Sequence, residues 1–374
     1  MNIGKLLLLF IFTFNIISCS VISNELANNK IDTKNLNKID IKWQKDYLYS
    51  NPENSFMPGI DNNIIFTSDY KGNLYRIDET DGSIILKYQL NKNLSSGTAV
   101  SSSKIFVTST DGYLLAVDRG SGKLIWQAQL PTISIEPPQA YNNSVLVKTN
   151  DDQLLAYDVD SGQLLWVYQG QTPSLTLRIF NSFQVIGPQV VLFGQAGGKL
   201  ALLNLSTGLV IWDNYITIPK GATDLDKLTD VSGRPVLNQK ETCVATYNGK
   251  ISCIDILSDN ILWSMDFSTI YGISIDENNL FAINTDGVVY CFNSLNGKVL
   301  WRNESFKDKD LNSPIVLNDL ILIIDDDGNV FGLRKTDGKI ISYAKSTLKD
   351  GVSYIPINNS IILQSVSGTL AIIT

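Results

Sequence analysis

The 374-residue sequence contains no histidine at all. That absence excludes Ser-His-Asp and Cys-His catalysis, histidine general bases and every metal site with a histidine ligand. Positive charge is also scarce, since 30 Lys and Arg stand against 37 Asp and Glu, a net charge of -7. Nucleic-acid binding needs clustered Lys and Arg, so we expect no nucleic-acid partner. Apolar residues make up 44% of the chain, which is enough for a buried core.

The N-terminus has the composition of a targeting segment. Lys5 is followed by an apolar run from Leu6 to Ile17, whose 12 residues fall short of the roughly 20 that a transmembrane helix needs. Residues 1–18 are therefore predicted to be a signal peptide that is removed. Residues 19–38 are rich in Asn, Lys, Asp and Ser and show no apolar period, so they are predicted to form a flexible tether.

The end of this segment, Ile16-Ile17-Ser18-Cys19, resembles the bacterial lipobox. The resemblance implies that Cys19 is acylated and becomes the first residue of the mature chain. Ser20 in the next position implies the outer membrane. Several acyl chains together are enough for firm anchoring. The alternative is plain secretion with cleavage nearby and an incidental cysteine.

The rest of the chain is an internal repeat. Turn glycines recur at steps of 38 to 51 residues, with Asp152 in the third place: Gly72, Gly112, Gly198, Gly249, Gly287, Gly328 and Gly368. Ten residues later comes a second glycine, with Asp259 as the exception: Gly82, Gly122, Gly162, Gly208, Gly297 and Gly338. Fourteen residues after the turn stands a tryptophan, or Leu86 or Ser342 in its place: Trp126, Trp166, Trp212, Trp263 and Trp301. About 40 residues of short strands and turns with one Trp are typical of a four-stranded propeller blade.

Eight such units predict an all-β fold, an eight-bladed β-propeller over residues 39–374. Length alone favours two or three domains, but units that bury their faces only by stacking make one domain. The last unit has its turn at Gly368, and its fourth strand is missing before Thr374. The segment Ile41 to Lys45, which contains Trp43, is available to supply it. We therefore expect the N- and C-terminal strands to close the ring within one blade.

An Asp or Asn follows the first turn by six residues in most units: Asp78, Asp118, Asp158, Asn204, Asp255 and Asn293. At that position the side chain can cap its own turn. Metal binding is the alternative, but one carboxylate per unit at a turn is typical of a structural part, and we expect no metal. Asp325 to Asp327 before Gly328 looks like the start of a calcium loop. It lacks the downstream spacing and Glu of such a loop, so another turn is predicted.

The pattern Leu-x-Ala-x-Asp-x-x-Ser-Gly-x-x-x-Trp, from Leu114 to Trp126, resembles the pyrroloquinoline-quinone (PQQ) repeat. That repeat occurs in quinoprotein dehydrogenases and in non-enzymatic propellers. Together with the lipobox and the eight units, the chain resembles the BamB family, lipoprotein subunits of the outer-membrane β-barrel assembly machinery. Residues 174–178 (Ser-Leu-Thr-Leu-Arg) and 222–231, in the two longest repeat steps, strengthen the resemblance. Long loops on a rigid ring often carry binding residues.

The resemblance implies that Leu175, Leu177, Arg178 and Asp230 contact the POTRA domains of the barrel subunit BamA. Ser232 stands where the family has a second acid. It further implies a periplasmic scaffold at the outer membrane, without catalytic residues or cofactor, monomeric within a hetero-complex. Such a scaffold aids the folding and insertion of outer-membrane proteins, and unfolded outer-membrane proteins are a second expected partner, captured at exposed blade edges. Taken without the resemblance, Leu175 and Leu177 are strand residues and Arg178 is a solvated charge.

Two other functions fit the same repeat. Quinone-dependent dehydrogenases resemble this chain in repeat and blade number, but they carry adjacent cysteines and a calcium site. Here Cys19, Cys243, Cys253 and Cys291 are all separated in sequence. A propeller that binds a sugar, a peptide or peptidoglycan through its face or central channel stays open.

The last three cysteines are predicted to be buried free thiols rather than a disulfide. A two-residue turn at Asn248-Gly249 would place Cys243 diagonal to Cys253 and not opposite it. Cys291 follows its turn glycine by the same four residues as Cys253, so it occupies the equivalent place in the next unit.

Overall fold

The computed structural model describes residues 31–49, 56–170, 173–177, 182–239 and 241–374. In these ranges the chain forms strands and turns, and no helix there has the length and apolarity needed to cross a membrane. The propeller unit runs from Thr33 to Thr374. The predicted signal peptide, Cys19 and Arg178 lie outside the described residues.

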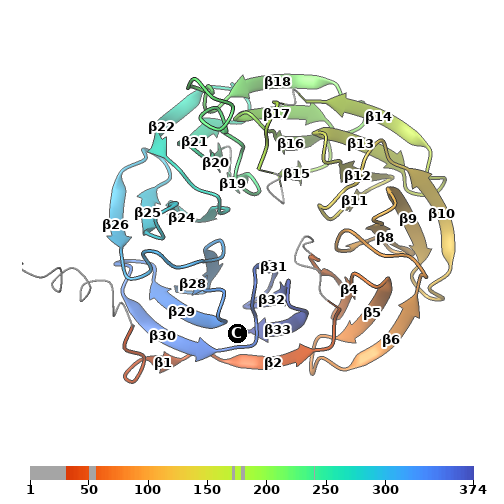
Figure 1. Ribbon diagram of the computed structural model, residues 1–374, viewed down its shortest axis with the longest axis horizontal. Coiled ribbons are helices and arrows are strands. Elements are labelled where there is room, and N and C mark those ends of the chain that lie inside the picture. Colours follow the sequence, from red (N-terminus) through yellow and green to blue (C-terminus); the bar gives the residue numbers. More distant parts are fainter. Residues whose placement is uncertain (1–30, 50–55, 171–172, 178–181, 240) are drawn as a thin grey trace, which may run out of the picture. The chain divides into compact units, whose positions relative to one another are not determined.

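Eight sheets of antiparallel strands stand around a common centre, and in all but the closing blade a short inner strand is matched by a longer strand at the rim (Figure 1). The first four blades, written from inside outward, are β3 (Gly59–Asp61), β4 (Ile64–Ser68), β5 (Asn73–Asp78) and β6 (Ile84–Gln89); β7 (Ala99–Val100), β8 (Lys104–Thr108), β9 (Tyr113–Asp118) and β10 (Leu124–Gln129); β11 (Gln139–Tyr141), β12 (Ser144–Lys148), β13 (Gln153–Asp158) and β14 (Leu164–Gln169); β15 (Phe183–Ile186), β16 (Val190–Gly194), β17 (Lys199–Asn204) and β18 (Val210–Tyr215).

The other four blades complete the ring, so the predicted eight-bladed propeller is confirmed. They are β19 (Val236–Asn238), β20 (Glu241–Ala245), β21 (Gly249–Asp255) and β22 (Ile261–Phe267); β23 (Ser274–Asp276), β24 (Asn279–Ile283), β25 (Val289–Asn293) and β26 (Val299–Asn303); β27 (Ile315–Leu317), β28 (Leu320–Ile324), β29 (Asn329–Arg334) and β30 (Ile340–Lys345), joined by β1 (Asn37–Lys38); and β31 (Val352–Ile357), β32 (Ser360–Ser365), β33 (Thr369–Ile373) and β2 (Ile41–Asp46).

The outer hairpin turns form as the residue pattern predicts. In the second blade the Asp118 carboxylate accepts hydrogen bonds from the amide and the hydroxyl of Ser121, both at 2.7 Å. These bonds lower the pKa of Asp118. Gly122 then turns the chain with a φ of +70° and donates its amide to the Asp118 carbonyl at 2.8 Å. The carboxylate is therefore engaged in its own turn.

In six of the eight blades a tryptophan connects the blade to the next one. The Trp126 ring lies over Gly162 of the following blade, where a β-carbon would come within 2.7 Å of the indole. The indole nitrogen donates a hydrogen bond to the carbonyl of Val159 at 3.1 Å. The other five make the same cross-blade bond: Trp43 to Glu79, Trp166 to Leu205, Trp212 to Ile256, Trp263 to Ser294 and Trp301 to Lys335. The second glycine of the repeat thus leaves room for an indole as well as turning the chain.

The first blade has Leu86 in the tryptophan place, and Tyr88 makes the cross-blade contact instead. Its ring occupies the space that a β-carbon on Gly122 would need. Its hydroxyl donates a hydrogen bond to the Gly120 carbonyl at 2.5 Å. Side chains two residues apart on a strand share a face, so Tyr88 points the same way as the missing tryptophan would.

The ring closes as predicted. Strand β2 pairs antiparallel with β33, and the pairing skips one residue between Ile41 and Trp43. The same bulge precedes the tryptophan place in the outer strands of the other seven blades. Trp43 then packs over Gly82 of the first blade. A strand from the N-terminus therefore completes the blade that the C-terminus leaves open.

Strand β1 adds a feature that the sequence analysis did not expect. Asn37 and Lys38, assigned to the tether, pair in parallel with Ser342 and Tyr343 of β30. Ile39, which follows, is only 4% exposed. Ser342 stands in a tryptophan place, so β1 covers the outer strand of this blade where the aromatic contact is missing. Two polar residues carry no periodicity that could have indicated this strand.

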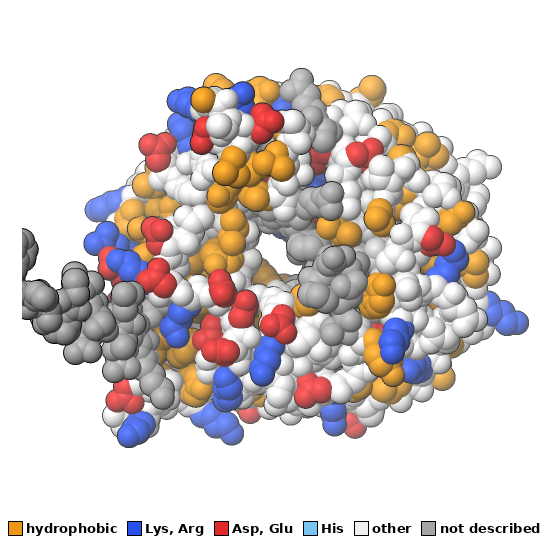
Figure 2. Space-filling view, in the orientation of Figure 1, with side chains coloured by type: hydrophobic (Ala, Val, Ile, Leu, Met, Phe, Trp, Pro, Cys, Tyr) orange, Lys and Arg blue, Asp and Glu red, His pale blue; other side chains and the backbone are white. Residues whose placement is uncertain are grey.

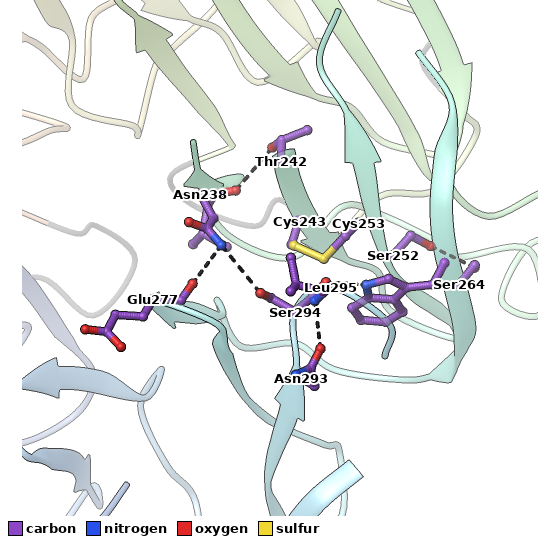
Figure 3. Close-up of a disulfide and its surroundings, with 12 residues drawn as sticks. Asn238, Thr242, Cys243, Ser252, Cys253, Ser264, Glu277, Asn293, Ser294 and Leu295 are labelled. Atoms are coloured by element: carbon purple, nitrogen blue, oxygen red, sulfur yellow. Dashed lines mark hydrogen bonds between the residues drawn. A yellow bond between two sulfur atoms is a disulfide. The ribbon is translucent and has the colours of Figure 1, made fainter. Parts of the chain in front are cut away.

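Cys243 and Cys253 form a disulfide between β20 and β21, so the prediction of free thiols at these positions is wrong (Figure 3). The reason is the length of the hairpin loop. Thr246 pairs with Lys250, so three residues separate the paired positions instead of the two of a two-residue turn. The register is therefore shifted, and the two cysteines face each other. Cys291 is free and buried, as predicted, and burial raises the pKa of its thiol to about 12.

We predict that Trp166→Ala lowers the free energy of unfolding by about 3–5 kcal/mol, because it removes a buried ring and leaves a cavity between blades. Leu165→Ala on the same strand is the control, since Leu165 is 49% exposed and should change stability by only about 0.5 kcal/mol. Chemical denaturation of both variants measures the difference. Equal losses would contradict the packing role of the tryptophans.

Candidate partner-binding surface

The loop between β14 and β15 exposes two leucines. β14 ends at Gln169 and β15 begins at Phe183, so Leu175 and Leu177 belong to a loop and are not strand residues. Their side chains are 43% and 36% exposed. Neither leucine enters the core, and exposed aliphatic side chains that gather on one surface are candidates for an interaction site.

The loop between β18 and β19, residues 216–235, lies against the first loop. Its fold is set by a local turn, in which the Thr223 amide donates to the Asp226 carboxylate at 3.1 Å and the Asp226 amide donates to the Thr223 hydroxyl at 3.2 Å. Ile218 and Leu225 are 65% and 63% exposed. Figure 2 shows hydrophobic side chains gathered over this loop.

Sequence reasoning did not single out Ile218 or Leu225 as binding residues. The available signal was their position, because each aliphatic residue stands in a loop beyond the strand pattern that ends at Tyr215. Aliphatic side chains outside the periodicity of a strand have no core to enter, so they remain on the surface.

Asp230 joins the two loops from below. It is 5% exposed, and its carboxylate accepts hydrogen bonds from the Leu177 amide at 2.6 Å and the Gly197 amide at 3.1 Å. The structure therefore brings Asp230 together with the loop of Leu175 and Leu177. Its carboxylate holds that loop in place and does not face solvent.

Ser232, which stands in the place of a second acid, is also buried, at 1% exposure. Its hydroxyl donates a hydrogen bond to the Thr269 carbonyl at 2.5 Å. A carboxylate there would meet a carbonyl oxygen without a proton to share. The serine is thus suited to its buried surroundings.

A cluster of buried charges lies beneath the first loop. The Lys148 ammonium is 2.8 Å from the Glu136 carboxylate and 3.6 Å from that of Asp152. Glu136 also accepts hydrogen bonds from the amide and hydroxyl of Ser182, both at 2.9 Å. Together with Asp230 these residues line a cavity of about 30 Å3. Drug-sized ligands need pockets of about 300 Å3 or more, so the cavity is no small-molecule site.

The pKa values in the cluster reflect three carboxylates around one ammonium. Burial raises the pKa of Asp152 to about 6, although Lys148 opposes the shift. Burial also raises the pKa of Asp230, against the hydrogen bonds from Leu177 and Gly197. Burial disfavours the charged form of Lys148, but Glu136 and Asp152 outweigh it and raise its pKa. Lys148 therefore stays cationic.

Comparison with known proteins identifies the family. A family model described as "Outer membrane protein assembly factor BamB" matches residues 70–303 and 274–343. Curated relatives of that description include one from Burkholderia pseudomallei, 33% identical over 179 residues (48% of this chain, 47% of the relative). Another, from Pseudomonas aeruginosa, is 28% identical over 189 residues (50% and 49%). The chain thus spans about half the length of the curated relatives it matches.

Solved structures show the same fold. The crystal structure of BamB from Moraxella catarrhalis superposes with a TM-score of 0.82 at 23% identity, covering 90% of this chain and 99% of that one. A quinohemoprotein alcohol dehydrogenase from Comamonas testosteroni shares the fold at a TM-score of 0.68 and 12% identity, over 92% and 77% of the two chains. Because the family model matches well over half of the sequence, the chain belongs to the family of outer membrane protein assembly factor BamB.

Proposed function

We propose that this protein is a non-enzymatic scaffold of outer-membrane β-barrel assembly. Acylated Cys19 anchors it to the periplasmic side of the outer membrane, where one copy joins a hetero-complex. The loop with Leu175, Leu177 and Arg178 binds the POTRA domains of a BamA-like barrel subunit. Membership of the BamB family supports this role, as do relatives described as outer membrane protein assembly factors.

The observation that carries the proposal is a pair of exposed leucines on a loop whose backbone is fixed from below. The Leu177 amide donates a hydrogen bond to buried Asp230. The loop therefore loses little conformational entropy when it binds a partner. Binding surfaces gain affinity when their conformation is set in advance. Two aliphatic anchors beside an arginine, which can pair bidentately with a carboxylate, make a compact hot spot.

The residues do not fit the quinone of the related dehydrogenase fold. The ring of adjacent cysteines that covers the quinone in such enzymes needs two consecutive residues at its site. Here the disulfide joins Cys243 and Cys253 across a hairpin inside one blade, and both side chains are fully buried. We therefore propose no redox activity for this chain.

We predict that the double variant Leu175→Glu/Leu177→Glu, and separately Arg178→Glu, abolishes co-purification of the barrel subunit. The first change puts two charges where aliphatic anchors would be desolvated, and the second reverses the charge of the pairing group. Affinity purification of the tagged full-length protein, with quantification of the barrel subunit, measures the effect.

Leu257→Glu is the matched control for this experiment. Leu257 is 80% exposed and lies in the outer turn between β21 and β22, away from the loop. The control should retain the barrel subunit, and all variants should keep the circular dichroism spectrum of a folded β-protein. Full recovery of the barrel subunit with both loop variants would remove the site assignment.

A second prediction concerns the anchor. Cys19→Ala should release the protein from the outer-membrane fraction into the soluble periplasm, because the acyl chains supply the membrane affinity. Membrane fractionation with metabolic palmitate labelling measures both properties. Unchanged membrane association of an unlabelled Cys19→Ala protein would rule out the lipid anchor as its cause.

A second candidate function is the transient capture of unfolded outer-membrane strands. The observation that favours it is a series of aliphatic bulge residues on the outer strands, each 44% to 53% exposed: Ile85, Ile125, Leu165, Ile211, Leu262 and Leu300. An outer strand also presents unpaired backbone groups to which an extended chain can add.

We predict that a photo-crosslinking residue at Ile125 or Ile211 traps precursors of outer-membrane proteins in cells. The same probe at Lys104, a buried position, is the control and should trap none. Crosslinks are read by immunoblotting for a major barrel protein. A rim probe that yields no precursor adduct, in cells that export barrel proteins at a normal rate, counts against strand capture.

A further inference from the structure

The candidate binding loop is attached to the propeller at three points. At its start, the Gly170 amide donates to the Asp152 carbonyl at 3.1 Å. In its middle, the Leu177 amide donates to the Asp230 carboxylate at 2.6 Å. At its end, Ser182 donates from its amide and its hydroxyl to the Glu136 carboxylate. Each acceptor lies outside the loop itself.

One cation lies among these attachments and pairs with the acceptor of the last one. Lys148, the last residue of β12, contacts Glu136 and Asp152, and its side chain is 13% exposed. Its charge also acts on Asp230. A buried carboxylate without a partner is costly, so removing Lys148 leaves Glu136 and Asp152 without their cation. That cost falls when the site opens to water or when the carboxylates take up protons. Opening the site means releasing the loop that covers it.

The other groups that face the cluster do not replace this cation. The charge of Arg234 acts on Glu136 from a distance, and no hydrogen bond between them is formed. Tyr168 lies near Asp152 and donates toward Asp213, and burial raises its pKa to about 12, so it is neutral. Among the described residues, Lys148 is the cation in direct contact with Glu136, which holds the end of the loop, and with the neighbouring carboxylate of Asp152.

We propose that Lys148 is a positioning residue for partner recognition. By neutralising Glu136 and Asp152 beneath the loop, it fixes the backbone that presents Leu175 and Leu177 to the partner. This inference rests on the proposed function for its consequence in binding, while the effect on the loop itself is measurable without any partner.

The test compares Lys148→Met with Lys104→Met in the full-length protein. Lys104 is an equally buried lysine with an ion pair to Asp160, at 10% side-chain exposure, in another blade. Hydrogen exchange of peptides covering 173–177 measures the loop. We expect Lys148→Met to speed exchange at Leu177 about tenfold and to weaken capture of the barrel subunit about tenfold, as for loss of a charge-assisted hydrogen bond. Lys104→Met should leave both unchanged.

The pH dependence separates positioning from general damage. In Lys148→Met the carboxylates lack their cation, so the attached loop binds protons more tightly than the released loop does. Protection at Leu177, corrected for intrinsic exchange, should therefore recover as the pH falls from about 8 to about 5. The double variant Lys148→Met/Glu136→Gln should recover protection at neutral pH, because it removes one charge and keeps the acceptor for Ser182. The double variant also allows loop protection to be measured if Lys148→Met alone fails to fold.

The outcomes distinguish this inference from the proposed function. If Lys148→Met leaves amide exchange at Leu177 unchanged, the positioning role is overturned. It is also overturned if exchange becomes fast and neither low pH nor the added Glu136→Gln change slows it. Fast exchange with undiminished capture overturns the link between loop order and binding. If Leu175→Glu/Leu177→Glu also captures the barrel subunit normally, the proposed function fails whatever the exchange of Lys148→Met.

Discussion

The contact between an outer-strand aromatic ring and the turn glycine of the next blade is the interaction on which this structure depends. A single blade leaves both faces open, so stability comes from stacking neighbours. Five indoles and Tyr88 make that contact. Trp212, which faces a blade with Asp259 in the glycine place, keeps the cross-blade hydrogen bond that the others also form. Because Trp43 continues the series from the other terminus, the last blade joins the first. The loops between blades therefore start and end on a rigid frame.

On that frame, one loop is held by buried charge. Three carboxylates and one ammonium lie buried beneath residues 173–177, and their desolvation costs free energy. Apolar residues of similar volume often give a fold equal or greater stability. The carboxylates of Asp230 and Glu136 instead accept hydrogen bonds from amides of the loop, which apolar residues cannot do. The same cluster that costs stability thus defines the course of a loop with two exposed leucines. That division of roles fits a surface kept ready for a partner.

Much of the fold could be predicted from spacing alone, because a turn that needs glycine and a contact that needs tryptophan recur together. The same spacing does not show that one turn is a residue longer. Because the register of Cys243 and Cys253 depends on that residue, the sequence predicts thiols where the structure has a disulfide. Nor could it show that Asp230 is buried. Residues 136, 148, 152 and 230 come from separate loops and strands, and only the closed ring brings their side chains together. The family resemblance points to the loop leucines, but it does not point to the carboxylates beneath them.

The central claim is that this propeller works by presenting a fixed loop to another protein. Electron cryomicroscopy of the intact assembly complex that contains the full-length chain tests it most directly. The account predicts density for a periplasmic domain of the barrel subunit over residues 173–177, with Leu175 and Leu177 buried in the contact. A complex in which that loop faces solvent and another surface of the ring carries the contact would contradict it.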